Sequence, residues 1–233
     1  MAYGSIPPPS TTTELPIVAY SLPNGSSLTC FPVTGQSASI ELCQFLCGVF
    51  NEELAMGRTY PQRGPMTLEE FTAYFFGATT IIGIVSASSS SSSTAVTDGQ
   101  AVEGVTLEQA RAGREWKDCV GGCYYVKPNY PGRASHNAGF LIPPTFRGLK
   151  IGKTLGRSYL IYGPKLGYRG SVFNLVFKNN LASLAIWDSL GFSRVGLIPA
   201  AGLLKTGPNG EEEYVDAVVV WKSFVDADGK PTA

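Results

Sequence analysis

The 233-residue sequence predicts a mixed α/β fold, and two observations carry the prediction. The front half holds short apolar runs bounded by turn residues, which are typical of mostly antiparallel strands. From Phe146 onwards the pattern alternates between helical and strand periodicity, as it does where helices connect the strands of a mixed sheet. The length suits one large domain, so we expect a single domain over residues 27–228.

The first 26 residues are rich in proline and threonine, and we expect residues 1–26 to form a poorly ordered tail. The segment has neither the basic nor the apolar region of a secretory signal. A Pro-Asn-Gly turn follows, and the run SLTCFPV over residues 27–33 predicts the first strand.

Two helices are expected next. Residues 39–57 carry apolar side chains at helical spacing, with Ser39 as N-cap and Gly57 as the stop. The second helix opens at Thr67, which forms a capping box with Glu70. A β-branched strand follows this second helix.

A serine tract then interrupts the apolar pattern, at about residues 86–105. Such a segment buries too little apolar surface to offset its ordering entropy, so we expect a flexible loop. Because strand signals resume at residues 118–129 and 137–144, the loop is expected to lie inside the domain.

Charge and hydropathy narrow the classes of partner. The chain has 18 acidic and 18 basic residues, whereas proteins that hold nucleic acid usually show a basic excess. No apolar run approaches the roughly 20 residues needed to cross a bilayer. We therefore expect no nucleic-acid or membrane partner, and a cytoplasmic protein with a mitochondrial fraction left open.

The thiols and the single histidine limit the chemistry. An odd number of cysteines without a secretory signal indicates reduced thiols, and their spacing differs from the usual zinc pattern. We interpret them as buried apolar residues and predict no metal site. His136 excludes sites that need two histidines, and we expect it in a solvated loop. The five cysteines are Cys30, Cys43, Cys47, Cys119 and Cys123.

The stretch RGLKIG, from Arg147 to Gly152, follows a strand and opens a helix. Free amides at a helix start, with small residues that allow close approach, bind phosphate. Lys150, Lys153 and Arg157 add positive charge. Alone the signal is weak, since a helix with two glycines and basic residues is most often only a helix.

A second segment raises the significance of the first. NLASLAIWDSLGF begins with Asn180, a good N-cap, and ends in the stop Gly-Phe. Before it, Asn174 interrupts an apolar run that predicts a buried strand, where an unsatisfied amide would cost about 1–3 kcal/mol. Asn179 is interpreted as a turn residue.

In order and spacing, the two segments resemble the signature of the GCN5-related N-acetyltransferases: an Arg/Gln-x-x-Gly-x-Gly/Ala loop for the pyrophosphate of coenzyme A, then Asn-x-x-Ala-x-x-Leu-Tyr-x-x-x-Gly-Phe. The resemblance covers the C-terminal half. It implies an acyl-CoA fold with a mostly antiparallel mixed sheet, splayed at its centre and flanked by helices, and acetyl-CoA as co-substrate. Lys150 replaces the middle glycine, and Trp187 replaces a tyrosine that protonates the thiolate. Indole is not a practical acid, so another route is implied.

Further stretches resemble the fungal proline-analogue acetyltransferases of the yeast Mpr type: YVKPNYPGRASHNAGF, YGPKLGY, FNLVFKNN, ASLAIWDSLGF, VGLIPAAG and, near Thr59, GRTYPQ. This resemblance implies detoxifying acetylation of the ring nitrogen of azetidine-2-carboxylate or cis-4-hydroxyproline, by direct attack in a ternary complex. It also leaves a homodimer open. The implied catalytic residues are Asn137, Asn174 and Asn180.

The same resemblance implies the binding residues. The substrate-binding set is Asn137, Phe140, Asn174 and Leu175. The cofactor-binding set is Phe140, Leu141, Ile142, Arg147, Gly148, Lys150, Ile151, Gly152, Lys153, Asn180 and Trp187.

No Glu or His stands in a recognisable base position, so a water relay is expected, with catalysis by positioning and an oxyanion donor from the GFLI strand. Two alternatives stay open: a relative that acetylates another small amine, and a silent acyl-CoA binding module. A plain capping role for Asn180 and a backbone-satisfied Asn174 also stay open.

Overall fold

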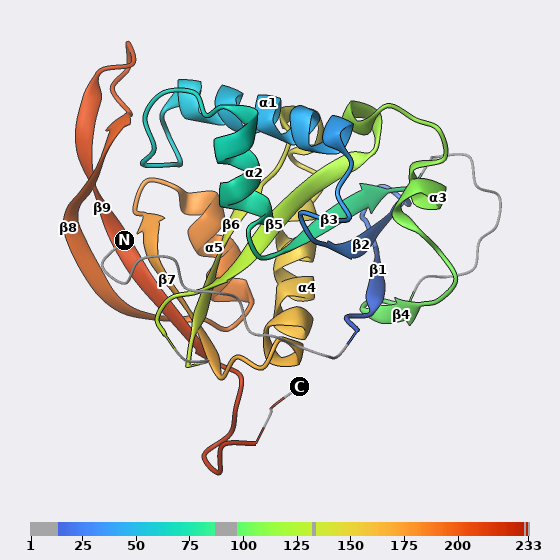
Figure 1. The fold of residues 1–233 in the computed structure, drawn as a ribbon. Coiled ribbons are helices and arrows are strands. Elements are labelled where there is room, and N and C mark those ends of the chain that lie inside the picture. The colour runs from blue at the N-terminus through green and yellow to red at the C-terminus, as the bar shows by residue number, and fades with distance from the viewer. Residues whose placement is uncertain (1–13, 87–96, 132–133, 231, 233) are drawn as a thin grey trace.

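The computed structural model describes residues 14–86, 97–131, 134–230 and 232. They form a nine-stranded sheet in the order β4-β1-β2-β3-β5-β6-β7-β9-β8, with helices on both faces (Figure 1). All neighbouring strands in this sheet are antiparallel except the pair β6 and β7. The predicted mixed α/β fold, mostly antiparallel and flanked by helices, is confirmed.

The strands are β1 (Ile17–Ser21), β2 (Ser27–Val33), β3 (Thr79–Val85), β4 (Gln100–Val102), β5 (Val120–Pro128), β6 (His136–Leu141), β7 (Gly170–Phe177), β8 (Ser193–Lys205) and β9 (Glu212–Ser223). The α-helices are α1 (Ile40–Met56), α2 (Leu68–Phe76), α3 (Leu107–Arg111), α4 (Ile151–Lys165) and α5 (Leu181–Ser189). Two short 3-10 helices cover Trp116–Asp118 and Pro144–Phe146.

The predicted caps of the first two helices are confirmed. The Ser39 hydroxyl accepts from the Leu42 amide at 3.2 Å, and Gly57 ends α1 with φ 65° in the left-handed region. Thr67 and Glu70 form both bonds of the capping box. These signals are local in the chain, so no tertiary contact is needed for them to act.

Two expectations from the sequence are wrong, because segments expected to be irregular contain strands of the sheet. The expected tail contains β1, which pairs with β2 and β4 and buries Val18 and Tyr20. The Pro-Asn-Gly turn is therefore the hairpin between β1 and β2. The expected loop over residues 86–105 contains β4. Residues 1–13 and 87–96 lie outside the described residues.

Two cores lie on the two faces of the sheet. The larger one packs α4 and α5 against the sheet, and the second packs α1 and α2 against the other face (Figure 1). All five cysteines are free and buried, as predicted. Burial raises the pKa of each thiol, for Cys30 to about 12. Among the described residues no cluster could hold a metal ion, and no helix is long and apolar enough to cross a membrane.

The sheet is weakly joined at its centre. Strands β6 and β7 share one register pair, His136 with Ser171, whereas β5 and β6 pair continuously. A side-chain contact adds to this single pair: Nδ1 of His136 in β6 lies 3.0 Å from the carbonyl oxygen of Gly170 in β7. The Tyr159 hydroxyl of α4 also lies 2.6 Å from the Ser171 hydroxyl of β7. Beyond it, no further register pair joins the two strands, so the sheet opens between them.

The expectation of a solvated loop histidine is wrong. His136 is the first residue of β6, is fully buried, and stacks on Tyr168 with ring centroids 4.4 Å apart. Desolvation lowers its pKa to about 3, so the imidazole is neutral. Since a carbonyl only accepts, Nδ1 carries the proton that bonds Gly170.

Candidate active site

The first turn of α4 can bind an anion. Its first three amides have no acceptor within the helix, no side chain caps them, and the turn holds no acidic residue. Gly148 and Lys150 both have positive φ, 82° and 59°, which curl the preceding loop around the helix start. The conformation explains why a glycine suits position 150. Phosphate groups fit this end because the helix dipole adds to the free amides.

Of the four basic residues expected near this loop, two are engaged elsewhere. Arg147 pairs with the buried Glu53 of α1 at 2.6 Å and donates to the Ile142 carbonyl at 3.2 Å. Arg157 pairs with Asp98 at 2.8 Å. Lys150 and Lys153 are exposed and form no ion pair with a described residue. They remain the available cations.

Glycines in α4 also serve packing. A Cβ at Gly152 would lie 3.2 Å from Ile186 of α5, and one at Gly156 would lie 2.6 Å from Leu190. Helix α5 therefore lies close against α4. Gly152 keeps the helix start small and admits α5 at the same time.

Asn137 and Asn174 lie on the same face of the sheet. In β6, His136 and Phe140 contact Tyr159 of α4, so Asn137 between them faces away from α4. In β7, Phe173 and Val176 both pack in the core around α4, and the register shift between them places Asn174 and Leu175 together opposite one residue of β9, facing away from α4. The two amides therefore lie on the side of α1 and α2, flanking the point where the strands diverge.

The alternative of a buried Asn174 satisfied by backbone groups is wrong, because the side chain is exposed. The pairing of β7 with β9 shifts register between Phe173 and Val176, and Asn174 is exposed within this irregular part. Such a bulge re-aims a side chain and leaves backbone groups outside the ladder. Leu175 is half-buried and packs in a small cluster around Phe177.

Asn180 is the N-cap of α5, as predicted, and its side chain accepts from the Ser183 amide at 3.1 Å. Trp187 lies in the core, stacked on Phe173 with centroids 4.3 Å apart. Its indole donates to the Ser183 hydroxyl at 3.1 Å. The tryptophan therefore packs this junction and keeps its N–H occupied.

The remaining predicted residues form the end of β6 and its exit. Phe140 stacks on Tyr124 with centroids 4.6 Å apart, Leu141 is buried, and Ile142 is half-buried. Asn137 donates to Asn129 at 3.3 Å, and Asn129 donates to the Val172 carbonyl of β7 at 3.1 Å. Asn129 thus bridges the two strands beside the amide pair, a role that sequence did not predict.

Sequence reasoning also missed a polar aromatic group on the same face. The Tyr60 hydroxyl donates to the Phe140 carbonyl at 2.8 Å, and the hydroxyls of Tyr74 and Tyr125 are 2.9 Å apart. Lys127 of β5 lies over both of the latter rings. A lysine as the one charged residue of an otherwise buried strand was the available signal.

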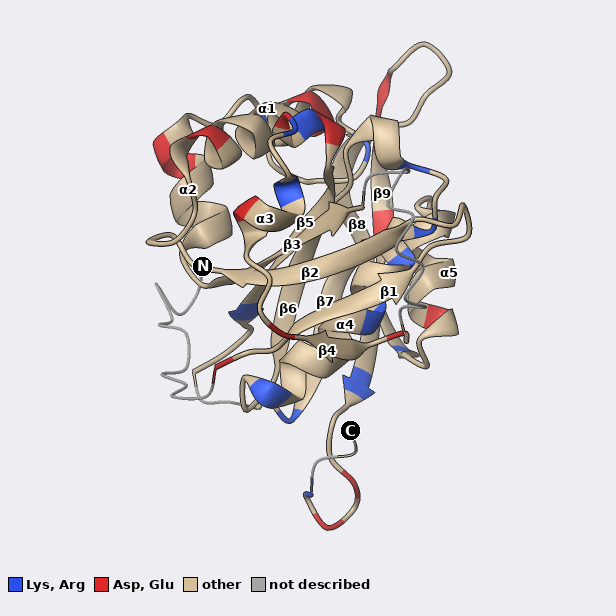
Figure 2. Cartoon of the chain, turned by 90° about the vertical axis from the view of Figure 1, so that its right-hand side faces the viewer, with Lys and Arg blue, Asp and Glu red and all other residues tan. Residues whose placement is uncertain are grey.

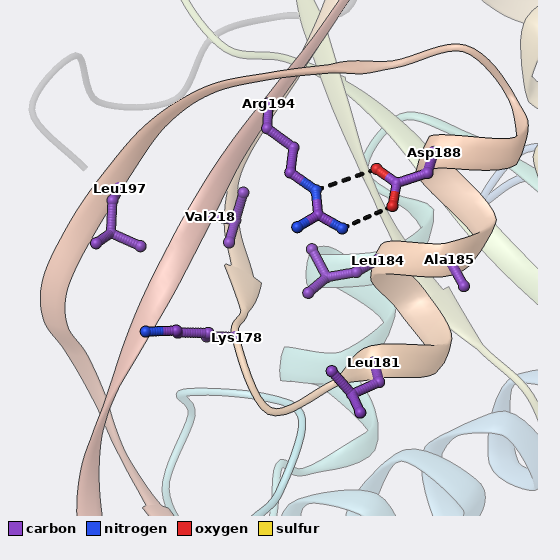
Figure 3. Close-up of a pocket in the computed structure, with 8 residues that line it drawn as sticks. All are labelled: Lys178, Leu181, Leu184, Ala185, Asp188, Arg194, Leu197 and Val218. Carbon is purple, nitrogen blue, oxygen red and sulfur yellow. Dashed lines mark hydrogen bonds and ion pairs between the residues drawn. The ribbon is translucent and has the colours of Figure 1, made fainter.

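A separate hollow of about 420 Å³ lies between α5 and the hairpin of β8 and β9 (Figure 3). Arg194 of β8 binds Asp188 of α5 across it through two contacts, 3.1 and 2.6 Å. None of the predicted site residues lines it. Its lining residues are Lys178, Leu181, Leu184, Ala185, Asp188, Arg194, Leu197 and Val218.

The chain was compared with families, sequences and structures of known proteins. No model of a protein family matches the chain. It is 40% identical over 186 residues to N-acetyltransferase aca1 of Schizosaccharomyces pombe, covering 79% of this chain and 81% of the relative. It is 30% identical to protein SPT10 of Saccharomyces cerevisiae over 78% of this chain but 31% of that protein.

Solved structures agree on the fold. A GCN5-related N-acetyltransferase from Kribbella flavida superposes with a TM-score of 0.59 at 21% identity, covering 84% of this chain and 97% of that one. A phosphinothricin acetyltransferase from Sinorhizobium meliloti in complex with AcCoA gives 0.60 at 17% identity, covering 88% and 93%. The chain therefore belongs to the GCN5-related N-acetyltransferases, enzymes that transfer an acetyl group from acetyl-CoA to an amine.

Proposed function

We propose that this enzyme acetylates the ring nitrogen of small cyclic amino acids, such as azetidine-2-carboxylate and cis-4-hydroxyproline, and thereby detoxifies proline analogues. The observation that carries the proposal is the pair Asn137 and Asn174, two neutral amides on one face at the divergence of β6 and β7. Neutral donors can hold a carboxylate while leaving the nearby amine free to lose its proton.

The coenzyme side is assigned to the start of α4. The free amides of Ile151, Gly152 and Lys153 would hold the pyrophosphate of acetyl-CoA, and the ammonium groups of Lys150 and Lys153 would add charge. The bound coenzyme supplies the thioester that is attacked. The chain's own contribution is to fix this group beside the opening between β6 and β7.

The acceptor side is assigned to the opposite face. The Asn174 amide and the Leu175 backbone N–H, both in the irregular part of β7, would hold the carboxylate. Asn137 would orient the ring nitrogen toward the thioester. His136 is unsuited as a base because it is buried and lies on the other face. Water is therefore the proposed route for the amine proton, and positioning the main catalytic contribution.

A different small amine is the first alternative acceptor, because one fold serves several. Structures with this fold include phosphinothricin acetyltransferases and a ribosomal-protein-alanine N-acetyltransferase. Figure 2 shows Lys and Arg on several elements, whereas the charged residues of α1 and α2 are all Glu. The chain as a whole has 18 basic and 18 acidic residues, and this balance favours a small molecule over a polyanionic acceptor. A silent acyl-CoA binder would have no use for the exposed Asn174.

The test is thiol release from acetyl-CoA with azetidine-2-carboxylate as acceptor. Loss of a hydrogen bond to a charged group costs about 1.5–3 kcal/mol, so Asn174→Ala should lower kcat/KM by about 10- to 150-fold. Asn179→Ala is the matched control, because Asn179 is an exposed turn residue nearby. Tight acetyl-CoA binding without turnover of any small amine would instead support the silent binder.

We also propose a homodimer through β8. It is an edge strand of 13 residues whose first eight are exposed, and Val195, Leu197 and Ile198 lie among them. Leu181, which lines the hollow beside the hairpin, and Tyr214 of β9 add exposed apolar surface. A long apolar edge needs a cover, and a second β8 related by a two-fold axis supplies one.

A further inference from the structure

Lys127 lies beside the proposed acceptor site. Strands β5 and β6 pair in register with Lys127 directly opposite Asn137. Directly opposite residues project from the same face of a sheet with Cβ atoms about 4.5–5.5 Å apart. The lysine therefore shares the face that carries Asn137 and Asn174.

The Lys127 ammonium is held by tyrosines and pairs with no carboxylate of the described residues. Its Nζ lies 4.3 Å from the ring centroid of Tyr74 and 4.6 Å from that of Tyr125. It forms no ion pair with any residue in the described part of the chain. Burial lowers its pKa to about 8. A half-buried cation in this setting is stabilised by any anion that binds next to it.

One contact of Lys127 is structural. Its ammonium donates to the Tyr74 carbonyl, in the last turn of α2. A cation there complements the helix dipole and satisfies a terminal carbonyl. An ammonium has three donors, however, and this contact uses one. The tyrosine rings hold the group in place and leave donor capacity for a ligand.

We propose that Lys127 selects acceptors that carry a carboxylate, by pairing its ammonium with the carboxylate of the amino acid bound between Asn137 and Asn174. This assignment rests on the proposed function and deepens it. The amides supply direction and Lys127 supplies charge, so an amine of equal size without a carboxylate is a poorer substrate. Tyr74 and Tyr125 act as positioning residues for the ammonium.

The test compares azetidine-2-carboxylate with azetidine, two acceptors that differ only in the carboxylate. For wild type, Lys127→Met, Lys127→Arg and the exposed-lysine control Lys117→Met, kcat/KM is measured for each acceptor together with KM for acetyl-CoA. We expect the ratio of acid to plain amine to fall at least tenfold in Lys127→Met, through the acceptor KM. Lys127→Arg should restore most of it, and Lys117→Met should match wild type.

An equal loss for both acceptors in Lys127→Met, or a wild-type enzyme indifferent to the carboxylate, would overturn the inference. If wild type instead turns over other amino acids and neither azetidine compound, the proposed substrate fails. The same ratio, taken between such an amino acid and its amine lacking the carboxylate, still tests Lys127. Where no amine is turned over, calorimetric titration of both azetidine compounds into the protein with coenzyme A decides. The inference is overturned if the two azetidine compounds bind equally well, or if Lys127→Met binds azetidine-2-carboxylate as wild type does.

Discussion

The Arg147 guanidinium lies 2.6 Å from the Glu53 carboxylate, and this contact joins the loop that precedes α4 to α1 across 94 residues of chain. Glu53 is buried, and the Thr59 hydroxyl also donates to it. Arg147 is half-exposed, so solvent screens part of the attraction. The loop proposed to receive the coenzyme is thus anchored to the helix layer on the other face of the sheet.

Removing the cation should destabilise the fold more than neutralising the acid. Arg147→Met leaves a buried carboxylate unpaired and should lower the free energy of unfolding by about 1–3 kcal/mol in urea titrations. Glu53→Gln should cost less, because a neutral amide is cheaper to bury. The double variant should cost less than the sum of the two. Strict additivity would mean that the pair is not coupled.

Two substitutions of Lys150 separate the effect of its backbone conformation from the effect of its charge. Lys150 has φ 59°, which costs a residue with a side chain about 1–2 kcal/mol relative to glycine. Lys150→Gly removes this cost but loosens the unfolded chain, so it should be more stable than Lys150→Ala by up to about 1 kcal/mol. Both variants lose the ammonium and should raise KM for acetyl-CoA alike. Unequal KM values would show that the backbone conformation at this position also matters for binding.

His136 should make stability depend on pH below neutrality. Its pKa is lowered to about 3 in the fold against about 6.5 in the unfolded chain, so between these values only the unfolded chain takes up the proton. The stabilising contribution is complete above about pH 6.5 and is lost as pH falls toward 3, at up to about 1.4 kcal/mol per pH unit.

The check is direct because the chain has one histidine, which gives one set of imidazole proton resonances. These should stay at the neutral position from pH 8 down to about 4.5 while the protein remains folded. His136→Phe should show a shallower decline of unfolding free energy below pH 6.5. A resonance that titrates near 6.5 in folded protein would contradict the buried placement.

Charge on β8 should separate the proposed dimer. Leu197 is 52% exposed on the edge strand, and Ile40, 55% exposed at the start of α1, is its matched control. Leu197→Lys should shift the mass measured by light scattering from dimer to monomer, since a buried unpaired charge opposes association. Ile40→Lys should leave the mass unchanged. A monomeric wild type would refute the interface.

Local signals predicted the parts of this fold that depend on neighbours in sequence. The Ser39 cap, the Thr67 and Glu70 capping box and the Asn180 cap each use atoms within one helical turn. The loop at Lys150 belongs to the same class, because its bend and its free amides follow from a few consecutive residues.

Features that depend on pairing between distant segments could not be predicted from the sequence. Strand β1 exists because β2 and β4 flank it, and its five residues carry too short a pattern alone. The exposure of Asn174 arises from a register shift against β9, 40 or so residues downstream. Lys127 meets Asn137 only through the hairpin register of β5 and β6. Periodicity reports which residues alternate, not which partner a strand meets.

The buried thiols have a practical consequence for kinetics. All five cysteines are free, buried and held in the protonated form by their raised pKa values. Disulfide reagents that report coenzyme release react with thiolates. The folded enzyme should therefore contribute almost no background colour in a continuous assay, and a burst of reactive protein thiol would report unfolding during turnover.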